Sequence, residues 1–233
     1  AYNNNPFSSI KVELLRNNTL QQTYSQNLSY ENQIAPFSFD INITAELAKY
    51  RIKIHTVYNG SEELVKDIDD SVAGDVFVIQ GQSNAAAVKY NGSANGYQSD
   101  YIRVYSGGNI SSSGLLSNDS WYYGQGDGNE NSSGNTGQWG LVLAKKLVDE
   151  FNIPIAIFNG AHGGQPISFF QAPTDYSSST NTNYGRLYYR LTKNGLKNAV
   201  RGILWSQGEA DSFTNGLSTN QYKEAFINLP MAV

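Results

Sequence analysis

The segment DVFVIQGQSN, residues 75–84, decides how this chain is interpreted. Its first half is a continuous apolar run, which is typical of a strand buried on both faces of a parallel sheet. Gly81 follows the run and permits a tight turn. Ser83 then lies at the carboxyl end of the strand, near the start of the next helix, where its backbone N–H faces outward. The sequence therefore predicts a serine hydroxyl at a sheet edge.

Downstream of this segment, predicted strands and helices alternate. Further buried or partly buried strands are expected at YIRVYS (101–106), IPIAIFNG (153–160) and VRGILWS (200–206). Apolar residues at helical spacing predict helices over 138–151, 184–199 and 219–229, although Gly195 weakens the second. This alternation predicts an α/β domain with a parallel sheet and helices on both faces. Ligands of such sheets bind at the carboxyl ends of the strands.

Upstream, residues 8–73 have a different texture, because short alternating segments are broken by Asn, Gly and Pro. These segments are SIKVELLR (9–16), YSQNLSY (24–30), FSFDINI (37–43), YRIKIHTVY (50–58) and EELVKDID (62–69). Evenly spaced short strands are typical of a small β-sandwich. We therefore expect an accessory β-sandwich domain over residues 1–73 and a second domain over 74–233.

Composition excludes several classes of protein. The 233 residues suit one large domain or a small and a medium one. A net charge of −4 argues against a nucleic-acid partner, because phosphate binding needs a concentrated basic face. No apolar run is long enough for membrane insertion. The absence of cysteine excludes disulfides, thiolate metal sites and a cysteine nucleophile.

The polar, tyrosine-rich and lysine-poor composition favours an exported protein, either secreted, periplasmic or at the cell surface. No signal peptide is visible at the start of the sequence, where polar Asn residues follow Ala1. We expect that such a segment was removed or lies outside this sequence.

A long segment rich in Gly, Ser and Asn lies between residues 106 and 137, and loops of this length in compact domains are functional or disordered. It carries Trp121 with two tyrosines, whose flat faces suit stacking on sugar rings; anchoring of the loop is an equally good interpretation. DGNEN at 127–131 begins like a calcium loop. Ser132 and Gln138 replace the Gly and Glu of an EF-hand, which argues against one and leaves only a weak cation site open.

Polar residues follow three of the predicted strands. Ser83 is a candidate nucleophile whose own N–H could donate to an oxyanion, although spacing alone favours an ordinary helix cap. In IFNGAHGGQPISFF, paired glycines let the backbone approach a ligand, and the Gly164 N–H is a second candidate donor. In ILWSQGEAD, the Gln207 side-chain amide is a third. A Gly-rich turn and a polar loop are the plain alternatives for these two segments.

Together the three segments resemble the SGNH-hydrolase superfamily, within it the sialate O-acetylesterase-like and acetylxylan-esterase-like carbohydrate esterases. GQSN resembles the first sequence block of the family, and the serine of that block corresponds to Ser83. GGQ resembles the second block, which is usually GGT, and the oxyanion glycine of that block corresponds to Gly164. WSQGEAD resembles the third, usually W-x-Q-G-E-x-D, with Gln207 in the place held by Asn elsewhere. The resemblance covers about residues 74–233 and implies a three-layer α/β/α, flavodoxin-like parallel sheet.

The sequence departs from this family in one respect. The family's catalytic histidine comes from a D-x-x-H block, and nothing after Asp211 resembles it. We therefore expect a domain that is incomplete at its C-terminus, little or no esterase activity from residues 1–233 alone, and an active complete protein. Of the two histidines, His55 is expected on a strand, and His162 is expected to pack in its loop or line the pocket rather than act as the base.

Glu209 has a second role by the same resemblance, because in some relatives the acid that orients the histidine comes from the third block. Bonding of Glu209 to backbone N–H groups of its loop is an equally good interpretation, and Asp211 is a weaker candidate for the acid.

The resemblance implies a serine carbohydrate esterase that removes O-acetyl groups from sialate- or xylan-type sugars through an acyl-enzyme, without metal or cofactor. The residues assigned to catalysis are Ser83, Gly164, Gln207 and Glu209, and those assigned to substrate binding are Gln82, Asn84, His162 and Trp121. The alternative is a non-catalytic carbohydrate-binding or adhesion protein on the same fold. A lipase or thioesterase is disfavoured by the third block and the lack of an apolar lid.

Overall fold

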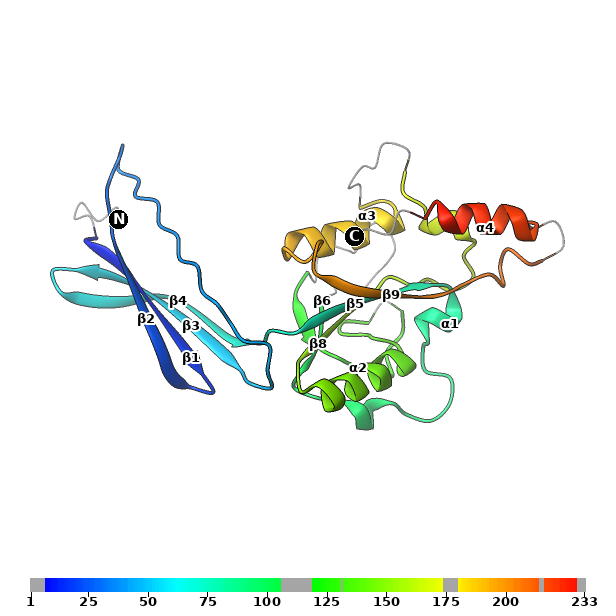
Figure 1. The fold of residues 1–233 in the computed structure, drawn as a ribbon, viewed down its shortest axis with the longest axis horizontal. Helices are drawn as coiled ribbons and strands as arrows, with labels where there is room; N and C mark the ends of the chain where they lie inside the picture. The colour runs from blue at the N-terminus through cyan, green and yellow to red at the C-terminus, as the bar shows by residue number, and fades with distance from the viewer. Residues whose placement is uncertain (1–6, 106–118, 131, 174–179, 214–215, 230–233) are drawn as a thin grey trace. The chain divides into compact units, whose positions relative to one another are not determined.

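The computed structural model describes residues 7–105, 119–130, 132–173, 180–213 and 216–229 (Figure 1). The chain divides into two compact units, residues 1–73 and residues 74–233. Within the described ranges, no helix has the length and apolar character needed to cross a membrane.

The first unit is built on one antiparallel sheet, in which the strands lie in the order β2-β1-β3-β4. Their bounds are Ser9–Arg16 for β1, Thr19–Asn27 for β2, Tyr50–Tyr58 for β3 and Ser61–Ser71 for β4. Alternate residues of β1 are buried, so one face of the sheet forms the core. Leu14, Ala48 and Tyr50 are the centre of this core.

The expected β-sandwich is not confirmed, because residues 7–73 contain this one sheet and no second one. FSFDINI (37–43), which was expected to be a strand, has no ladder partner among the described residues. Its Ile41 and Ile43 instead pack on the core of the single sheet. Alternating apolar residues indicate only that one face is buried, and an extended segment without cross-strand hydrogen bonds satisfies the same pattern. Pro36, which has no N–H, precedes this segment.

The second unit contains a five-stranded sheet in the order β7-β6-β8-β5-β9. The parallel strands are β5 (Asp75–Gly81), β6 (Ile102–Tyr105), β8 (Ile155–Asn159) and β9 (Val200–Ser206). These strands lie within the four apolar runs that the sequence indicated. The edge strand β7 (Trp121–Tyr123) pairs antiparallel with β6 and falls inside the segment expected to be a loop. Residues 106–118 of that segment lie outside the described residues.

Helices lie on both faces of this sheet, with α2 on one face and α3 and α4 on the other (Figure 1). Their bounds are Gln138–Phe151 for α2, Asn183–Lys193 for α3 and Thr219–Ile227 for α4. Shorter pieces are α1 (Ser83–Ala86) and the 3-10 helices η1 (Asn95–Tyr97) and η2 (Ile167–Phe170). The helix expected over 184–199 ends earlier, because Gly195 takes a positive φ of 68° that breaks the helical path.

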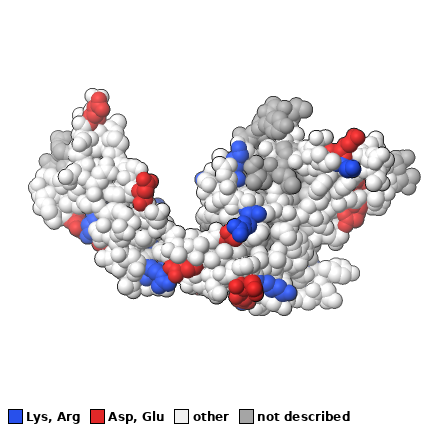
Figure 2. All heavy atoms as spheres, in the orientation of Figure 1, with Lys and Arg blue, Asp and Glu red and all other residues white. Residues whose placement is uncertain are grey.

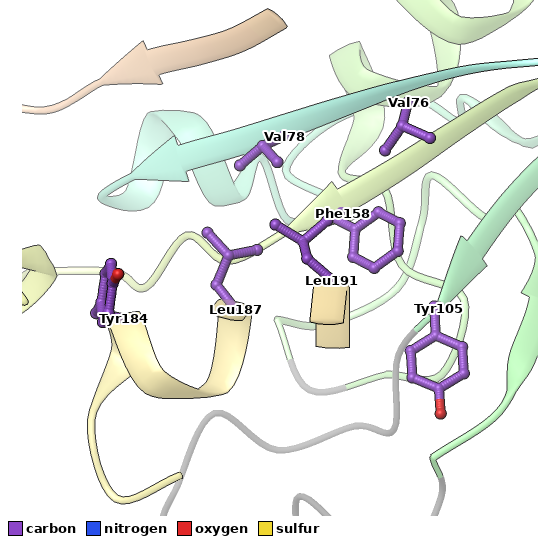
Figure 3. Packing of buried hydrophobic residues seen from close by; sticks show 7 residues of the cluster. All are labelled: Val76, Val78, Tyr105, Phe158, Tyr184, Leu187 and Leu191. Carbon is purple, nitrogen blue, oxygen red and sulfur yellow. The ribbon is translucent and has the colours of Figure 1, made fainter. Parts of the chain in front are cut away.

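Successive side chains of β5 point to opposite faces of the sheet, so they pack against different helices. Val78 lies against Phe158, Leu187 and Leu191 in the cluster under α3, where Figure 3 shows these side chains converging. On the other face, a Cβ at Gly140 of α2 would lie 2.8 Å from Cδ1 of Ile79, so α2 approaches the sheet closely there. Burial of each large apolar side chain stabilises such a core by about 1.5–3 kcal/mol.

The connections between the parallel strands run over both faces of the sheet. The chain before β8 carries α2 on one face, and the chain from β8 to β9 carries α3 on the opposite face. Sheets of this kind bind ligands at the carboxyl ends of their strands. The turns that follow β5, β8 and β9 meet at this edge.

The surface carries few charges. On the face that Figure 2 shows, lysine, arginine, aspartate and glutamate of the described residues are scattered among neutral atoms, and opposite charges often adjoin. Charged residues make up 15% of the sequence, in keeping with this view.

Candidate active site

The turn after β5 is bonded to the turns after β8 and β9 through its backbone. Gln82 N–H donates to the Ser206 carbonyl at 2.9 Å, and His162 N–H donates to the Gly81 carbonyl at 2.9 Å. Gly81 has a φ of 128°, and a Cβ there would lie 2.0 Å from the Ser206 oxygen. Only glycine meets both requirements, so the first turn depends on this residue.

Ser83 is the first residue of α1, and it is exposed at the sheet edge rather than packed in the interior. No acceptor in the described part of the chain takes its backbone N–H. A Cβ placed on Gly163 would lie 3.8 Å from the Ser83 Cβ, so the serine and the glycine pair are in van der Waals range. The hydroxyl and its own N–H are thus both open to a ligand beside the second turn.

The two glycines of the second turn differ in their hydrogen bonding. Gly163 N–H donates to Glu130 Oε1 at 2.8 Å. Gly164 has a φ of 69°, open space where a side chain would start, and an N–H that no described residue accepts. Gly164 therefore has the free donor, as the assignment of an oxyanion glycine requires.

His162 is half-buried beside these glycines. Its Nδ1 lies 3.3 Å from Glu130 Oε2, and its ring stacks on Phe169 with centroids 5.2 Å apart. The histidine therefore packs within its turn, as expected. No contact between its ring and Ser83 is among the interactions of the described residues.

Gln207 reaches the site with its amide already bonded. Its Nε2 donates to Asp211 Oδ2 at 2.5 Å and lies 3.2 Å from the Gln165 carbonyl. Its Oε1 lies 2.8 Å from the Tyr222 hydroxyl, which can donate to it. A carboxylate accepts only, so the nitrogen must face Asp211. Donation from Gln207 to an oxyanion would require an N–H to leave one of these acceptors, and that role stays a prediction.

Gln82 connects the first and third turns from the buried side. Its Oε1 accepts from Ala210 N at 3.0 Å and lies 3.3 Å from Gln207 Nε2. Asp211, which is also buried, accepts from Ile167 N at 2.8 Å and so connects the third turn to the segment after the second. These two side chains support the edge on which Ser83 stands, and a substrate contact by Gln82 stays a prediction.

Glu209 is exposed and lies against the first turn. Its Oε1 accepts from Asn84 Nδ2 at 2.5 Å, and the Asn84 carbonyl accepts from Trp139 Nε1 at 2.8 Å. Glu209 thus bonds a side chain of the first block through its carboxylate. This places an acid beside the serine turn, and the orientation of a histidine by Glu209 stays a prediction.

Trp121 has no contact with the three turns among the interactions of the described residues. Trp121 lies on β7, where its ring contacts Tyr105 and Phe158 and its Nε1 donates to Asn194 at 3.1 Å. These contacts anchor the indole, although Trp121 remains partly exposed to solvent. His55 lies on β3 of the first unit, with Nε2 3.5 Å from Glu13 Oε2.

Two functional candidates had no separate signal in the sequence. Glu130 lies in the DGNEN segment, where only a cation loop was considered, and Tyr222 lies on the predicted helix over 219–229. Burial raises the pKa of Tyr222, so its hydroxyl stays protonated and can donate near neutral pH. Glu130 and Tyr222 both bond residues that are distant in sequence, and the spacing of apolar residues along the chain does not reveal such partners.

No group of three or more His, Asp or Glu side chains is arranged to hold a metal ion among the described residues. Asp127 of the DGNEN segment has other partners, because its oxygens accept from Ser93 Oγ at 2.5 Å and Ala94 N at 2.8 Å. Those hydrogen bonds, Ser93 first, lower the pKa of Asp127 to about 2. The carboxylate therefore anchors its loop in the ionised form.

A comparison with known protein families finds a match over residues 73–233. This stretch, more than half of the chain, matches the family model described as carbohydrate esterase, sialic acid-specific acetylesterase. No curated protein matches the chain.

Among solved structures, the chain is similar to a carbohydrate acetylesterase from Xanthomonas citri, with 18% identity, a TM-score of 0.49 and coverage of 97% of this chain and 50% of that one. It is also similar to a protein from Arabidopsis thaliana, with 16% identity, a TM-score of 0.46 and coverage of 66% and 65%. The chain thus spans about half of the first structure and less than two thirds of the second.

Proposed function

This chain belongs to the carbohydrate esterase family of sialic acid-specific acetylesterases, and from that premise we propose that it supplies the nucleophile and oxyanion site of a serine esterase that removes O-acetyl groups from sugars. One observation supports this most directly. Ser83 is exposed with an unbonded N–H and adjoins Gly163, and the N–H of the next residue, Gly164, is also unbonded among the described residues. Helices on both faces of the sheet support a three-layer SGNH arrangement.

In the proposed mechanism, Ser83 Oγ attacks the acetyl carbonyl and forms a tetrahedral oxyanion. The N–H groups of Ser83 and Gly164 donate to that oxyanion, and Gln207 adds a third donor if one of its N–H groups turns from its present acceptor. Each such donor contributes about 3 kcal/mol of transition-state stabilisation. The sugar oxygen leaves with a proton, and water then attacks the acetyl-serine and releases acetate.

The proton transfers need a base, and neither histidine of this chain lies in a D-x-x-H sequence. An unassisted serine hydroxyl is a weak nucleophile. We therefore propose that residues 1–233 alone turn over acetyl esters slowly or not at all, and that the protein containing them is active. Steady turnover by residues 1–233 would contradict this.

The substrate class is an acetylated carbohydrate, of sialate or xylan type. The description of the matched family names sialic acid, and the Xanthomonas citri protein is described as a carbohydrate acetylesterase. Acetate release from O-acetylated sialosides, acetylated xylan and acetylated pectin separates the sugars. No release from any acetylated sugar by the protein containing this chain would reject the proposal.

A carbohydrate-binding or adhesion protein is the second candidate, and the absence of D-x-x-H favours it. It would bind glycans through the same edge without turnover. Binding of an acetylated glycan that is not followed by acetate release identifies this function.

The sharpest test of the proposal is Ser83→Ala in the protein that contains this chain. Because the exposed hydroxyl supports no packing, hydrolysis of an aryl acetate should fall at least about 1,000-fold while the melting temperature stays within about 1 °C. The control Ser61→Ala, on exposed β4, should change neither. Unaltered hydrolysis in Ser83→Ala would remove this residue from the mechanism.

A further inference from the structure

Glu130 extends from the segment before α2 to the turn after β8, which is 33 residues away in sequence. One carboxylate oxygen accepts from Gly163 N–H at 2.8 Å, and the other lies 3.3 Å from His162 Nδ1. A carboxylate can accept at both oxygens at once, and its charge makes each bond stronger than a bond between neutral groups. One side chain therefore bonds Gly163 and lies against the ring of His162, its neighbour in the turn.

The fit between this carboxylate and the turn is close. A Cβ at Gly163 would lie 2.8 Å from Glu130 Oε1, so the contact requires glycine at that position. The same Cβ would lie 3.8 Å from the Ser83 Cβ. The carboxylate, the glycine and the nucleophile candidate thus occupy adjoining positions.

His162 provides the second point of attachment. Its backbone N–H bonds the Gly81 carbonyl at 2.9 Å, and its ring stacks on Phe169. Its Nδ1 is buried and lies 3.3 Å from Glu130 Oε2, but it makes no hydrogen bond among the described residues. No lysine or arginine in the described ranges pairs with Glu130, so the His162 ring is the group that faces its second carboxylate oxygen there.

The consequence concerns the next residue. With Gly163 N–H taken by Glu130, Gly164 N–H is the donor of the pair that stays unbonded within the described chain. That N–H belongs to the peptide between the two glycines, and Glu130 fixes the peptide before it, which carries the Gly163 N–H. A displacement of about 1 Å in such a donor can lower a rate about 100-fold.

We propose that Glu130 is a positioning residue of the esterase site, which holds Gly163 beside His162 so that Gly164 N–H points at the oxyanion. This inference rests on the proposed esterase function. Glu130 contacts no substrate in this proposal and acts through the turn alone.

Three variants, made in the protein that contains this chain, separate the effect of the length of the Glu130 side chain from the effect of its charge. Glu130→Gln keeps the reach, and its amide oxygen can still accept from Gly163 N–H, so kcat should stay within about 3-fold of wild type. Glu130→Asp keeps the charge but is one methylene shorter, and Glu130→Ala removes both. For these two, kcat should fall about 10- to 100-fold, with KM within about 2-fold.

The matched control is Asp127→Asn, in the same segment but bonded to Ser93 and Ala94 rather than to the turn. It should leave kcat unchanged even if it lowers the melting temperature. Wild-type kcat in Glu130→Ala, or a rise in KM alone, would overturn the proposal. Equal loss in Glu130→Gln and Glu130→Ala would overturn it as well, because charge rather than reach would then matter.

A second readout does not need turnover. Hydrogen exchange of the Gly163 amide, followed by NMR, should be at least about 10-fold faster in Glu130→Asp and Glu130→Ala than in wild type and Glu130→Gln, because a bonded amide exchanges only on local opening. Unchanged exchange would reject the role of Glu130 in any case. Faster exchange in a protein without esterase activity would instead reject the proposed function while Glu130 still holds the turn.

Discussion

At the scale of single residues, Gln207 and Ser83 lie at the same edge of the sheet but differ in how many of their polar groups are already hydrogen-bonded. Ser83 is open to solvent, and its N–H is unbonded in the described chain. Gln207 is enclosed by an acceptor-only carboxylate on one side and the Tyr222 hydroxyl on the other. Its loss should therefore affect stability as well as catalysis.

Gln207→Ala should lower kcat more than it raises KM, because an oxyanion donor acts mainly in the transition state. It should also lower the free energy of unfolding by about 1–3 kcal/mol, since Asp211, buried at 7% exposure, loses a donor. Kinetics and urea unfolding measure the two effects.

Tyr222→Phe is the control for this variant. It removes the hydroxyl that faces Gln207 Oε1 but leaves the Nε2 groups in place. It should lower stability by about 0.5–1.5 kcal/mol with little change in kcat. If Gln207→Ala and Tyr222→Phe reduce kcat alike, Gln207 supports the turn rather than the oxyanion.

At the scale of elements, the site depends on a strand that ends in a turn only glycine can form. β5 runs directly into α1, and the Gly81 turn lies against the last residue of β9. The backbone bonds of this turn join the first block to both others, so its geometry sets the position of Ser83.

Gly81→Ala should reduce the free energy of unfolding by about 3 kcal/mol or more, because φ is 128° and the new Cβ would meet the Ser206 oxygen at 2.0 Å. Denaturant unfolding measures this loss. Gly92→Ala is the matched control, since Gly92 also has a positive φ, 66°, but open space around it. Strain alone should cost about 1 kcal/mol there. Equal losses in the two variants would show that the contact with Ser206 is unimportant.

At the scale of the whole molecule, carboxylates with lowered pKa values occur in both units. In the first unit, Arg16 and then Tyr50 donate to Glu46 and lower the pKa of that carboxyl to about 2. In the second unit, Asp127 has a pKa of about 2 for the reasons given above. Acid should therefore weaken each unit separately.

A carboxyl whose folded pKa lies below its unfolded value stabilises the fold above the unfolded pKa, and that contribution is lost as pH falls through the folded pKa. The difference in melting temperature between wild type and Glu46→Gln should thus be full above about pH 5 and shrink toward zero near pH 2. Circular dichroism melts between these pH values measure it. A difference that is independent of pH would contradict the lowered pKa of Glu46.

Tryptophan fluorescence supplies the control, because all three tryptophans lie after residue 74 and report on the second unit. Glu46→Gln should leave the melt followed by fluorescence unchanged. Asp127→Asn should shift that melt, again with a difference that disappears toward pH 2. A shift of the fluorescence melt by Glu46→Gln would mean that the two units unfold together.

Local patterns in the sequence determined the main features of the second unit. Continuous apolar runs identified the strands β5, β8 and β9, because a strand buried on both faces has no polar alternation. Turn residues placed Ser83, Gly164 and Gln207 after those strands, and the match of residues 73–233 to a carbohydrate esterase family confirms the resemblance that these blocks carry. Each of these features is encoded within a few consecutive residues.

Only the tertiary structure decided which distant groups meet. The bond from Glu130 to Gly163 spans 33 residues, and the bond from Asn84 to Glu209 spans 125. Residues 37–43 alternate like a strand but pack without a ladder, so residues 7–73 form one sheet instead of two. Periodicity reports which face of a segment is buried, whereas hydrogen-bond partners depend on how separate segments are brought together in space.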